Sequence, residues 1–472
     1  MKHRSRTFIA LVVVVSIALL ASACSSSRKT SSSSPTTAAP AGGTTPSSTQ
    51  TFGTLASPCG PGNASGATDL GVTDTSIRIA YGDDRGFVGS PGLDQEMGDA
   101  VTAMIKWCNG QGGIDGRKIV GDDLDAAVTN VTTVMQEACK QDFMLVGEGF
   151  ALDEAAEATR LGCNLTAAPG YTVGPDVANA PEVYDALPNP VDYLPASIFY
   201  EAAKFFPTQV KAYDFLHTTL TSATEVGYTK AAPAAAAAGW NKLNCGVTIN
   251  YNGEPNYTPF AQKFKNCGVQ VIYNNLPASP QLFGMMDAIN QVGLHPIWVS
   301  SADDYSAEMA QWNTAGIANS MYVQTSFVPL EEADINPAVQ KYENLVEADG
   351  GKLSLLGEQA TSAFLLWATE AKACGSDLTR QCMVNNLSQV HSWTGGGLHA
   401  PSNPGSNLPA TCGMVLKLTG TVWTQYYPKT AGQFDCSPQY LFKEPPSAWG
   451  TTLNSQRMAT KFMSSNVILP KS

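Results

Sequence analysis

Apolar residues repeat with two different periods along most of this chain. Residues 77–82 form a short β-branched run, which predicts a buried strand. Between residues 92 and 109 the apolar positions recur every three or four residues, which predicts a helix with one apolar face. That face contains Met97, Ala100, Val101, Met104, Ile105 and Cys108. Strand and helix patterns therefore follow one another from the start of the folded region.

The alternation of strand and helix occurs twice. The first series predicts strands at 77–82, 116–124, 143–147 and 163–171, and helices at 92–109, 129–141, 152–163 and 193–206. The second predicts strands at 209–216, 245–252, 269–275, 296–301 and 321–328, and helices at 223–240 (interrupted at Pro233), 259–267 and 279–293. Two long helices at 337–349 and 357–374 follow, and then β-strands within 414–427. This order predicts an α/β protein with two lobes, each a parallel sheet flanked by helices.

The first 23 residues have the pattern of a signal peptide. Basic residues at the start precede an apolar run, 8–21, and then small residues. The run has about 14 residues, whereas a bilayer-spanning helix needs roughly 20. The sequence Ala21-Ser22-Ala23-Cys24 resembles a bacterial lipobox, which implies that Cys24 is lipidated and becomes the new N-terminus. We therefore expect a lipid anchor on the extracytoplasmic face of the cell membrane, with ordinary cleavage and a free Cys24 as the alternative.

Residues 24–56 hold the expected lipid site and a segment of Ser, Thr, Pro and Gly. No apolar period is present there, so this segment cannot bury a core and is predicted to be a disordered linker. About 415 residues remain beyond it, which is enough for two domains of roughly 100–200 residues each.

Charge and cysteine content narrow the possible functions. Three of the 28 basic residues and none of the 40 acidic ones leave with the leader, so the net charge changes from −12 to −15. Such acidity argues against binding to nucleic acid. Ten cysteines without a CxxC motif favour disulfides in an exported protein, with buried free thiols as the alternative. Local pairing would join Cys245–Cys267, Cys374–Cys382 and Cys412–Cys436, and we add Cys139–Cys163 and Cys59–Cys108.

Enzyme and metal motifs are absent from the sequence. It contains no HExxH, GxSxG or GxxxxGK pattern, and its histidines lack metal-ligand spacing. Asp122, Asp123 and Asp125 resemble the start of a calcium loop, but the later ligands are missing, so we interpret them as solvated charges at a strand end. We therefore expect neither a cofactor nor a metal.

The ends of the predicted strands are the most informative positions for function. In open parallel sheets, ligands bind beyond the carboxyl ends of the strands. These loops are rich in small polar and aromatic residues, which suit a small-molecule pocket. The alternative is that Ser300, Ser301 and Asp303 only cap the next helix. Our candidate ligand contacts are Asp83, Asp84, Gly149, Phe150, Ala168, Tyr171, Thr172, His217, Tyr273, Asn274, Ser301 and Asp303.

Several segments resemble a known family when taken in order. They are GVTDTSIRIAYG (71–82), WCNGQGGIDGRKI (107–119), FMLVGEG (143–149), AAPGYT (167–172), PFAQKFKNCGVQVIYNN (259–275), MMDAINQVGLHPIWVSS (285–301) and GGGLHAP (395–401). The chain resembles the leucine/isoleucine/valine-binding proteins, the type I periplasmic substrate-binding proteins of ABC importers. The resemblance covers about residues 70 to 440, and GGIDGRKI is its best single signal.

The resemblance implies a fold and a function. The fold would have two Rossmann-like lobes joined by three hinge strands, with lobe 1 at 57–207 plus 326–394 and lobe 2 at 208–325 plus 395–472. A small-molecule ligand would bind between the lobes and close them. The loaded protein, expected to be a monomer, would then dock on ABC permease subunits. Catalysis is not expected.

Residue-level comparison with the family makes a plain branched-chain amino acid doubtful. The family's hydroxyl-rich loop for the ligand carboxylate corresponds to 149–153, which has no hydroxyls. The acid that holds the ligand's ammonium would fall near Ala302, where Asp303 is close. Thr172 and Tyr273 match family contacts. We therefore expect an amino-acid-like solute, an amide or a related amphipathic metabolite.

Two other readings stay open from the sequence. The same fold can serve as a sensor that passes closure to a membrane signalling partner. A hydrolase using Asp83 or Asp84 is a third reading, although its motifs are missing.

Overall fold

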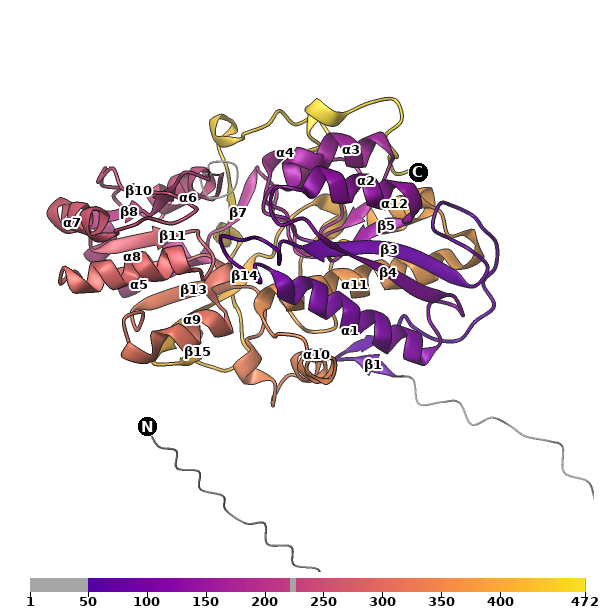
Figure 1. The fold of residues 1–472 in the computed structure, drawn as a ribbon, viewed down its shortest axis with the longest axis horizontal. Coiled ribbons are helices and arrows are strands. Elements are labelled where there is room, and N and C mark those ends of the chain that lie inside the picture. Colours follow the sequence, from indigo (N-terminus) through magenta and orange to yellow (C-terminus); the bar gives the residue numbers. More distant parts are fainter. Residues whose placement is uncertain (1–49, 221–225, 472) are drawn as a thin grey trace, which may run out of the picture. The chain divides into compact units, whose positions relative to one another are not determined.

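The computed structural model describes residues 50–220 and 226–471 (Figure 1). The predicted leader and the expected lipid site at Cys24 lie outside the described residues. Within the described ranges, no helix combines the length and the apolar character needed to cross a membrane. The expected linker ends earlier than predicted, because β1 (Thr51–Phe52) and β2 (Leu55–Ala56) form a hairpin whose Phe52 is buried against Trp107.

The first sheet has the order β4-β3-β5-β6 and is parallel throughout. Its strands are β3 (Ser76–Asp83), β4 (Lys118–Asp125), β5 (Met144–Val146) and β6 (Ala167–Ala168). Ile77 and Ile79 pack into the same core as the apolar face of the first helix, whereas Ala80 packs into a core on the other face. This alternation is the period of two expected for a strand covered by helices on both sides.

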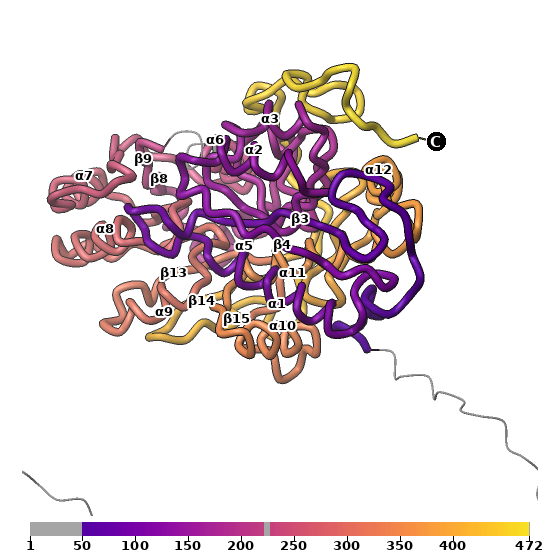
Figure 2. The backbone as a smooth tube through the Cα atoms, turned by 45° about the vertical axis from the view of Figure 1, so that its right-hand side comes forward, coloured from indigo at the N-terminus to yellow at the C-terminus, as the bar shows by residue number. Residues whose placement is uncertain are grey.

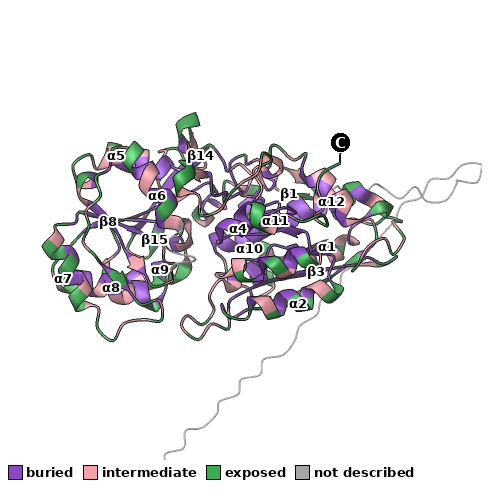
Figure 3. Ribbon diagram, turned by 90° about the horizontal axis from the view of Figure 1, so that it is seen from above, coloured by how far each residue is buried: buried purple, intermediate pink, exposed green. Residues whose placement is uncertain are grey.

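Helices lie on both faces of the first sheet (Figure 1). Those of the first lobe are α1 (Gln95–Gln111), α2 (Val131–Gln141), α3 (Glu157–Gly162), α4 (Pro175–Ala178), α10 (Pro337–Ala348), α11 (Leu355–Cys374) and α12 (Arg380–Leu387). Helix α11 packs against α1 and is buried along most of its length, whereas α2 carries several exposed residues (Figure 3). Near-continuous apolar sequence in α11 explains its central position.

The second sheet is mixed rather than purely parallel. Its path is β15-β14-β13-β12-β11-β8, in which β8, β11, β12 and β13 are parallel and the last two strands pair antiparallel. Its strands are β8 (Tyr213–Phe215), β11 (Val271–Asn274), β12 (Ile297–Ser300), β13 (Met321–Thr325), β14 (Cys412–Thr419) and β15 (Val422–Tyr427). Its helices are α5 (Ser197–Phe205), α6 (Val226–Ala237), α7 (Thr258–Cys267), α8 (Pro280–Gln291) and α9 (Ala307–Trp312).

Three local predictions differ from the structure. The expected interruption at Pro233 is wrong, because α6 continues through this residue within a run of alanines, which favour helix. The predicted helix at 193–206 begins as a strand, β7 (Tyr193–Pro195), paired with β17 (Leu441–Lys443). The predicted strand at 245–252 is only β10 (Thr248–Ile249), paired with β9 (His217–Thr218).

The chain passes between the two sheets three times. It leaves the first sheet after β6, returns after β13 to form α10 and α11, and enters the second sheet again at β14. Packing differs from the expected lobe boundaries at two places. Helix α5, expected in lobe 1, shares a core with β8 and β11. The C-terminal residues, expected in lobe 2, lie on the first lobe.

The C-terminal segment runs over α3 (yellow in Figures 1 and 2). Arg457 makes two hydrogen bonds to the carboxylate of Asp192, at 2.7 and 3.0 Å. The backbone N–H of Ile468 donates to Glu182, and Asn164 donates to the carbonyl of Asn466. The segment starts beside the second sheet, where β16 (Asp435–Cys436) pairs with β14. It is therefore joined to both lobes.

Disulfides connect all ten cysteines of the described residues. The pairs are the five favoured by the sequence: Cys59–Cys108, Cys139–Cys163, Cys245–Cys267, Cys374–Cys382 and Cys412–Cys436. Local pairing predicted three of these, and the two pairs that we added, Cys139–Cys163 and Cys59–Cys108, are confirmed as well.

Candidate functional site

Adjoining cavities lie where the carboxyl ends of the two sheets meet. We call the first, of about 930 Å³, the acidic chamber. Its walls include Phe87, Ser90, Leu93, Asp94, Met97, Gly149, Phe150, Tyr171, Leu220, Tyr251, Asn275, Leu276, Gln281, Asp303 and Leu356. The second, of about 880 Å³, is the lysine chamber. Its walls include Tyr171, Pro175, Asn189, Ile198, Phe199, Lys230, Tyr273, Asn275, Ser300, Ser301, Ala302 and Gln324.

The acidic chamber combines aromatic walls with two carboxylates. Asp94 comes from the loop before α1 and Asp303 from the loop after β12, so one belongs to each lobe. Among the described residues that line this chamber there is no Lys, Arg or His. The loop before α1 also reaches the second lobe, where Phe87 stacks on Tyr251 at a ring distance of 6.5 Å. The walls of the acidic chamber are therefore mainly apolar and aromatic, and Asp94 and Asp303 add two acidic groups to them.

Burial makes both carboxylates reluctant to ionise. It raises the pKa of Asp94 well above the ordinary value, and the nearby acids Asp84 and Asp303 raise it further. Burial also raises the pKa of Asp303 to about 6. The charge of Asp303 raises the pKa of Tyr171, which lines the same chamber. A cationic or hydrogen-bond-donating group would relieve this repulsion.

The lysine chamber has the opposite charge. Lys230 of α6 is 5% exposed, and its Nζ donates to Asn189 Oδ1 at 2.7 Å. Burial lowers the pKa of Lys230 to about 8, so the group is still mainly protonated at neutral pH. Tyr273 lines the same chamber and stacks on Phe199 at a ring distance of 5.5 Å. The chamber can therefore offer a cation, amides and hydroxyls to an acceptor group.

A third cavity, of about 620 Å³, adjoins the acidic chamber and shares Asp94 and Asp303 with it. Glu96, Glu308 and Lys352 also line this cavity. Burial raises the pKa of Glu96 to about 7. This side of the cleft is thus acidic as well.

Half of the candidate contacts from the sequence lie on these walls. Gly149, Phe150 and Asp303 line the acidic chamber, Tyr273 and Ser301 line the lysine chamber, and Tyr171 lines both. Thr172 lies instead at a smaller cavity inside the first lobe, with Glu148 and Arg160. Ala168 is buried within β6 and lines none of these cavities.

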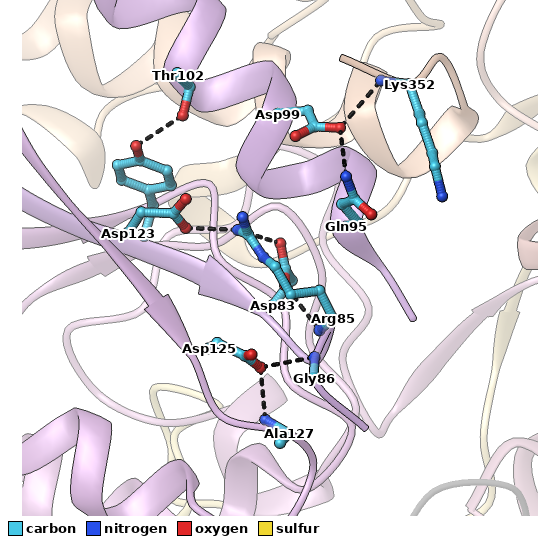
Figure 4. A network of polar contacts seen from close by, with 11 residues as sticks. Asp83, Arg85, Gly86, Gln95, Asp99, Thr102, Asp123, Asp125, Ala127 and Lys352 are labelled. Carbon is cyan, nitrogen blue, oxygen red and sulfur yellow. Dashed lines mark hydrogen bonds and ion pairs between the residues drawn. The ribbon is translucent and has the colours of Figure 1, made fainter. Parts of the chain in front are cut away.

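Asp83 and Asp84 have internal partners and do not line the chambers. Both are fully buried. Arg85 donates to Asp83 through Nε at 2.8 Å and Nη2 at 2.7 Å, and also to Asp123 at 2.6 Å (Figure 4). Asp84 accepts from the backbone N–H groups of Val128 and Ala151. These two acids hold the loops around β3 rather than a solute.

Asn274 and His217 also contact protein groups. Asn274 is fully buried, and its amide donates to Asp304 Oδ2 at 2.7 Å. His217 packs edge-on against Tyr228 and Phe215. Neither lines the chambers. Asn274 and His217 are therefore better explained as residues that hold the protein structure beneath the cleft.

The acids at the end of β4 are exposed or half-buried, as expected for charges at a strand end, and each also has a protein partner. Asp122 forms an ion pair with Arg78, and Asp123 forms one with Arg85. Asp125 accepts from the N–H groups of Gly86 and Ala127, both at 3.0 Å (Figure 4). In the part of the chain that the structure describes, no cluster of three His, Cys, Asp or Glu side chains has the arrangement of a metal site.

Sequence reasoning missed Asp94, Phe87, Tyr251 and Lys230. Asp94 precedes a helix and looks like a cap, but it has φ 57° and makes no capping hydrogen bond. Lys230 was visible as the single charge in an alanine-rich helix, 226–237, although charges on helices usually face solvent. Phe87 and Tyr251 are far apart in sequence and meet only through the fold.

Comparisons with known proteins agree with this architecture. The family described as periplasmic binding protein matches residues 77–420. No curated protein matches the sequence. The fold is similar to a fatty acid ABC transporter substrate-binding protein from Thermomonospora curvata, with TM-score 0.62 and 15% identity over 82% of this chain and 96% of that one.

Two ligand-bound structures are also similar in fold. The branched-chain amino acid transporter substrate binding protein LivJ from Streptococcus pneumoniae, in complex with isoleucine, has TM-score 0.59 and 13% identity over 75% of this chain and 100% of that one. A branched chain amino acid ABC transporter from Thermus thermophilus with bound valine has TM-score 0.61 and 10% identity, over 78% and 98%. Since the family match spans well over half of its length, this chain belongs to the periplasmic binding protein family.

Proposed function

We propose that this chain is the solute receptor of an ABC importer. It captures a small molecule in the chambers between its lobes and delivers it, as a monomer, to membrane permease subunits. The observation that carries the proposal is the pair of chambers at the carboxyl ends of both sheets, built from residues of both lobes. A solute that contacts both lobes favours the arrangement in which they are close together, and this is how binding would be signalled to a permease.

The proposed activity is binding without turnover. Similar structures contain isoleucine or valine, and another is named for fatty acids, so the fold accommodates different solutes. Mass spectrometry of solute released from the purified protein tests the proposal. We expect one class of small molecule at a stoichiometry near one per chain, and equilibrium calorimetry should reproduce its binding. Chemical conversion of that molecule on incubation would contradict a pure receptor.

We propose further that lipid on Cys24 holds the receptor at the extracytoplasmic face of the cell membrane. The linker that follows could reach roughly 30 Å, from about 5–6 Å × √n. Expression of the full chain and of Cys24→Ser, followed by fractionation, tests the anchor. The full chain should be in the membrane fraction and should incorporate labelled fatty acid. The variant should lose both properties, and its retention in the membrane would contradict the proposal.

A further inference from the structure

The C-terminal segment, residues 435–471, runs beside the places where the chain crosses between the lobes. The first crossing is residues 187–196, before α5, and the third crossing is residues 401–411, before β14. The family match ends at residue 420, so the C-terminal segment lies beyond it. This segment leaves the second sheet and ends on the first lobe (Figures 1 and 2). It therefore joins the lobes in addition to the three crossings.

The second lobe holds one end of the C-terminal segment. Cys436 is bonded to Cys412, and β16 pairs with β14 at the same two residues. The hydroxyl of Tyr440 donates to Glu201 of α5, a helix that shares its core with β8 and β11. A covalent bond and a buried hydrogen bond therefore fix residues 435–440 to the second lobe.

The first lobe holds the other end. Lys461 donates to Asp176 of α4 at 2.6 Å. Gln381 of α12 donates to the carbonyl of Leu469 at 2.9 Å. Since α4 and α12 both belong to the first lobe, residues 461–471 follow that lobe when the cleft opens or closes.

Arg457 lies between the two ends and contacts two crossings at once. Its Nε and Nη2 donate to Asp192 in the first crossing, at 3.0 and 2.7 Å. Its Nη1 donates to the carbonyl of Ser406 in the third crossing. The side chain of Asp192 is 5% exposed. A bidentate ion pair has a specific geometry, so Arg457 fixes the spacing of these two crossings.

The backbone at Arg457 is held in an uncommon conformation. Its φ is 65°, in the left-handed region that side chains other than glycine rarely adopt. Its carbonyl accepts from Asn179 Nδ2 at 3.0 Å, and a bridge between Leu453 and Ala459 closes the hairpin around it. Such a conformation persists where the surroundings determine it, and here it directs the guanidinium at the two crossings.

The first crossing is also a wall of the cleft. Four of its residues line the lysine chamber: Asn189, Val191, Leu194 and Pro195. Behind this wall, β17 of the C-terminal segment pairs with β7, and the N–H of Glu444 donates to the carbonyl of Asp192 at 2.9 Å. Support of the first crossing therefore acts on the hinge and on the cleft together.

We infer that the C-terminal segment is a brace on the hinge, with Arg457 as its positioning residue. It ties the first and third crossings together and limits how far the lobes separate. A hinge opens through φ/ψ changes at a few residues, and a fixed spacing of two crossings restricts them. The inference rests on the proposed receptor function, because it names a control on the opening of the proposed cleft.

Pulsed electron paramagnetic resonance on the purified, exhaustively dialysed protein tests the inference. Spin labels on Asn344 of α10 and Gln262 of α7, both exposed, report the distance between the lobes. Unnatural side chains carry the labels, so the disulfides stay intact. We expect a narrow distance distribution for the parent. Arg457→Met should broaden it and shift it to longer distances, and Arg457→Lys, which keeps the charge but not the fork, should lie between them.

Arg78→Met is the matched control. Arg78 also pairs with an aspartate, Asp122, and its side chain is 34% exposed against 27% for Arg457. This pair lies within the first lobe, so its loss should leave the distance between the lobes unchanged. An unchanged distribution in Arg457→Met, or equal broadening in Arg78→Met, would overturn the inference.

Cleavage of the segment in the folded protein is a second test, which holds even where Arg457→Met does not fold. A protease recognition site inserted between Ser455 and Gln456, both exposed in the hairpin, allows the segment to be cut after folding. Cutting should broaden the distribution relative to the same sample before cleavage. The same distribution before and after complete cleavage would overturn the inference.

Failure of the receptor function has a different signature. If a released solute binds to the parent and the distance distribution does not respond to Arg457→Met or to cleavage, the brace fails and the receptor function stands. If the distribution responds but neither released solute nor a metabolite extract binds, the brace stands and the receptor function fails.

Discussion

Two pairs of aspartates lie at or just beyond the carboxyl ends of strands, and the two pairs have different roles. Asp83 is the last residue of β3 and Asp84 follows it, while Asp303 and Asp304 lie in the loop after β12. Arg85 compensates the first pair from two residues away, and backbone N–H groups complete it. No cation compensates the second pair within the described residues, so Asp303 remains on the cleft wall. Whether an acid stabilises the fold or lines the binding site therefore depends on its neighbours and not on its position at a strand end.

Among the predicted changes, removal of Arg85, the cation that compensates Asp83, should have the largest effect on stability. Arg85→Met would leave Asp83 buried without its partner, and we expect the free energy of unfolding to fall by about 3 kcal/mol. The loss should be smaller at pH 5 than at pH 8, because an unpartnered Asp83 would take up a proton. Urea denaturation at both pH values measures it. Lys352→Met, with a largely exposed side chain, is the matched control and should change stability by less than about 0.5 kcal/mol. A loss as small as this control's would contradict a framework role for Arg85.

Removal of the second acid of the first pair should have a smaller effect. Asp84→Ala would leave the N–H groups of Val128 and Ala151 without their acceptor, at a cost of about 2 kcal/mol. Asp84→Asn keeps an acceptor oxygen and should lose less. Thermal unfolding of the two variants gives the difference. If the alanine variant is as stable as the parent, Asp84 does not hold these loops.

Substitution of Asp303, the acid on the cleft wall, should have the smallest effect on stability. This substitution should stabilise the protein, whereas the other two destabilise it. The pKa of Asp303 is raised to about 6 in the folded protein, so its ionisation in the unfolded chain opposes folding increasingly from about pH 4, and the effect is complete above about pH 6. Asp303→Asn should therefore increase the free energy of unfolding at pH 8 by about 1 kcal/mol, after allowance for solvent screening. The gain should disappear below about pH 4, where Asp is protonated in both states. Denaturation curves across this range would show a constant difference if Asp303 were a framework residue instead.

Much of the fold could be predicted because its determinants are local. The apolar periods of β3 and α1 are visible in consecutive residues, and four of the five disulfides join cysteines no more than 24 residues apart. The pairing of β7 with β17 could not be predicted, since Pro195 and Leu441 are 246 positions apart in the sequence and neither segment has a strong strand pattern. The continuation of α6 through Pro233 depends on the surrounding helix and not on the proline alone.

The site was only partly predictable. Strand ends pointed to Tyr171, Tyr273 and Asp303, which do line the chambers. The same rule also selected Asp83, whose partner Arg85 was already visible two residues away in the sequence. Lys230 could not be recognised as a cavity residue, because its partner Asn189 and its neighbours in the cavity wall come from distant parts of the chain. Such long-range contacts are what a linear pattern cannot show.

The C-terminal segment has a practical consequence for optical measurements of cleft closure. Its course begins at the second sheet, where Cys436 is bonded to Cys412, and ends beside Asn385 on the first lobe, where Lys471 donates its N–H. A fluorophore fused at the C-terminal end would therefore move with the first lobe, although the preceding strand belongs to the second. A second fluorophore on the exposed face of α7 would complete a pair whose energy transfer follows the distance between the sheets.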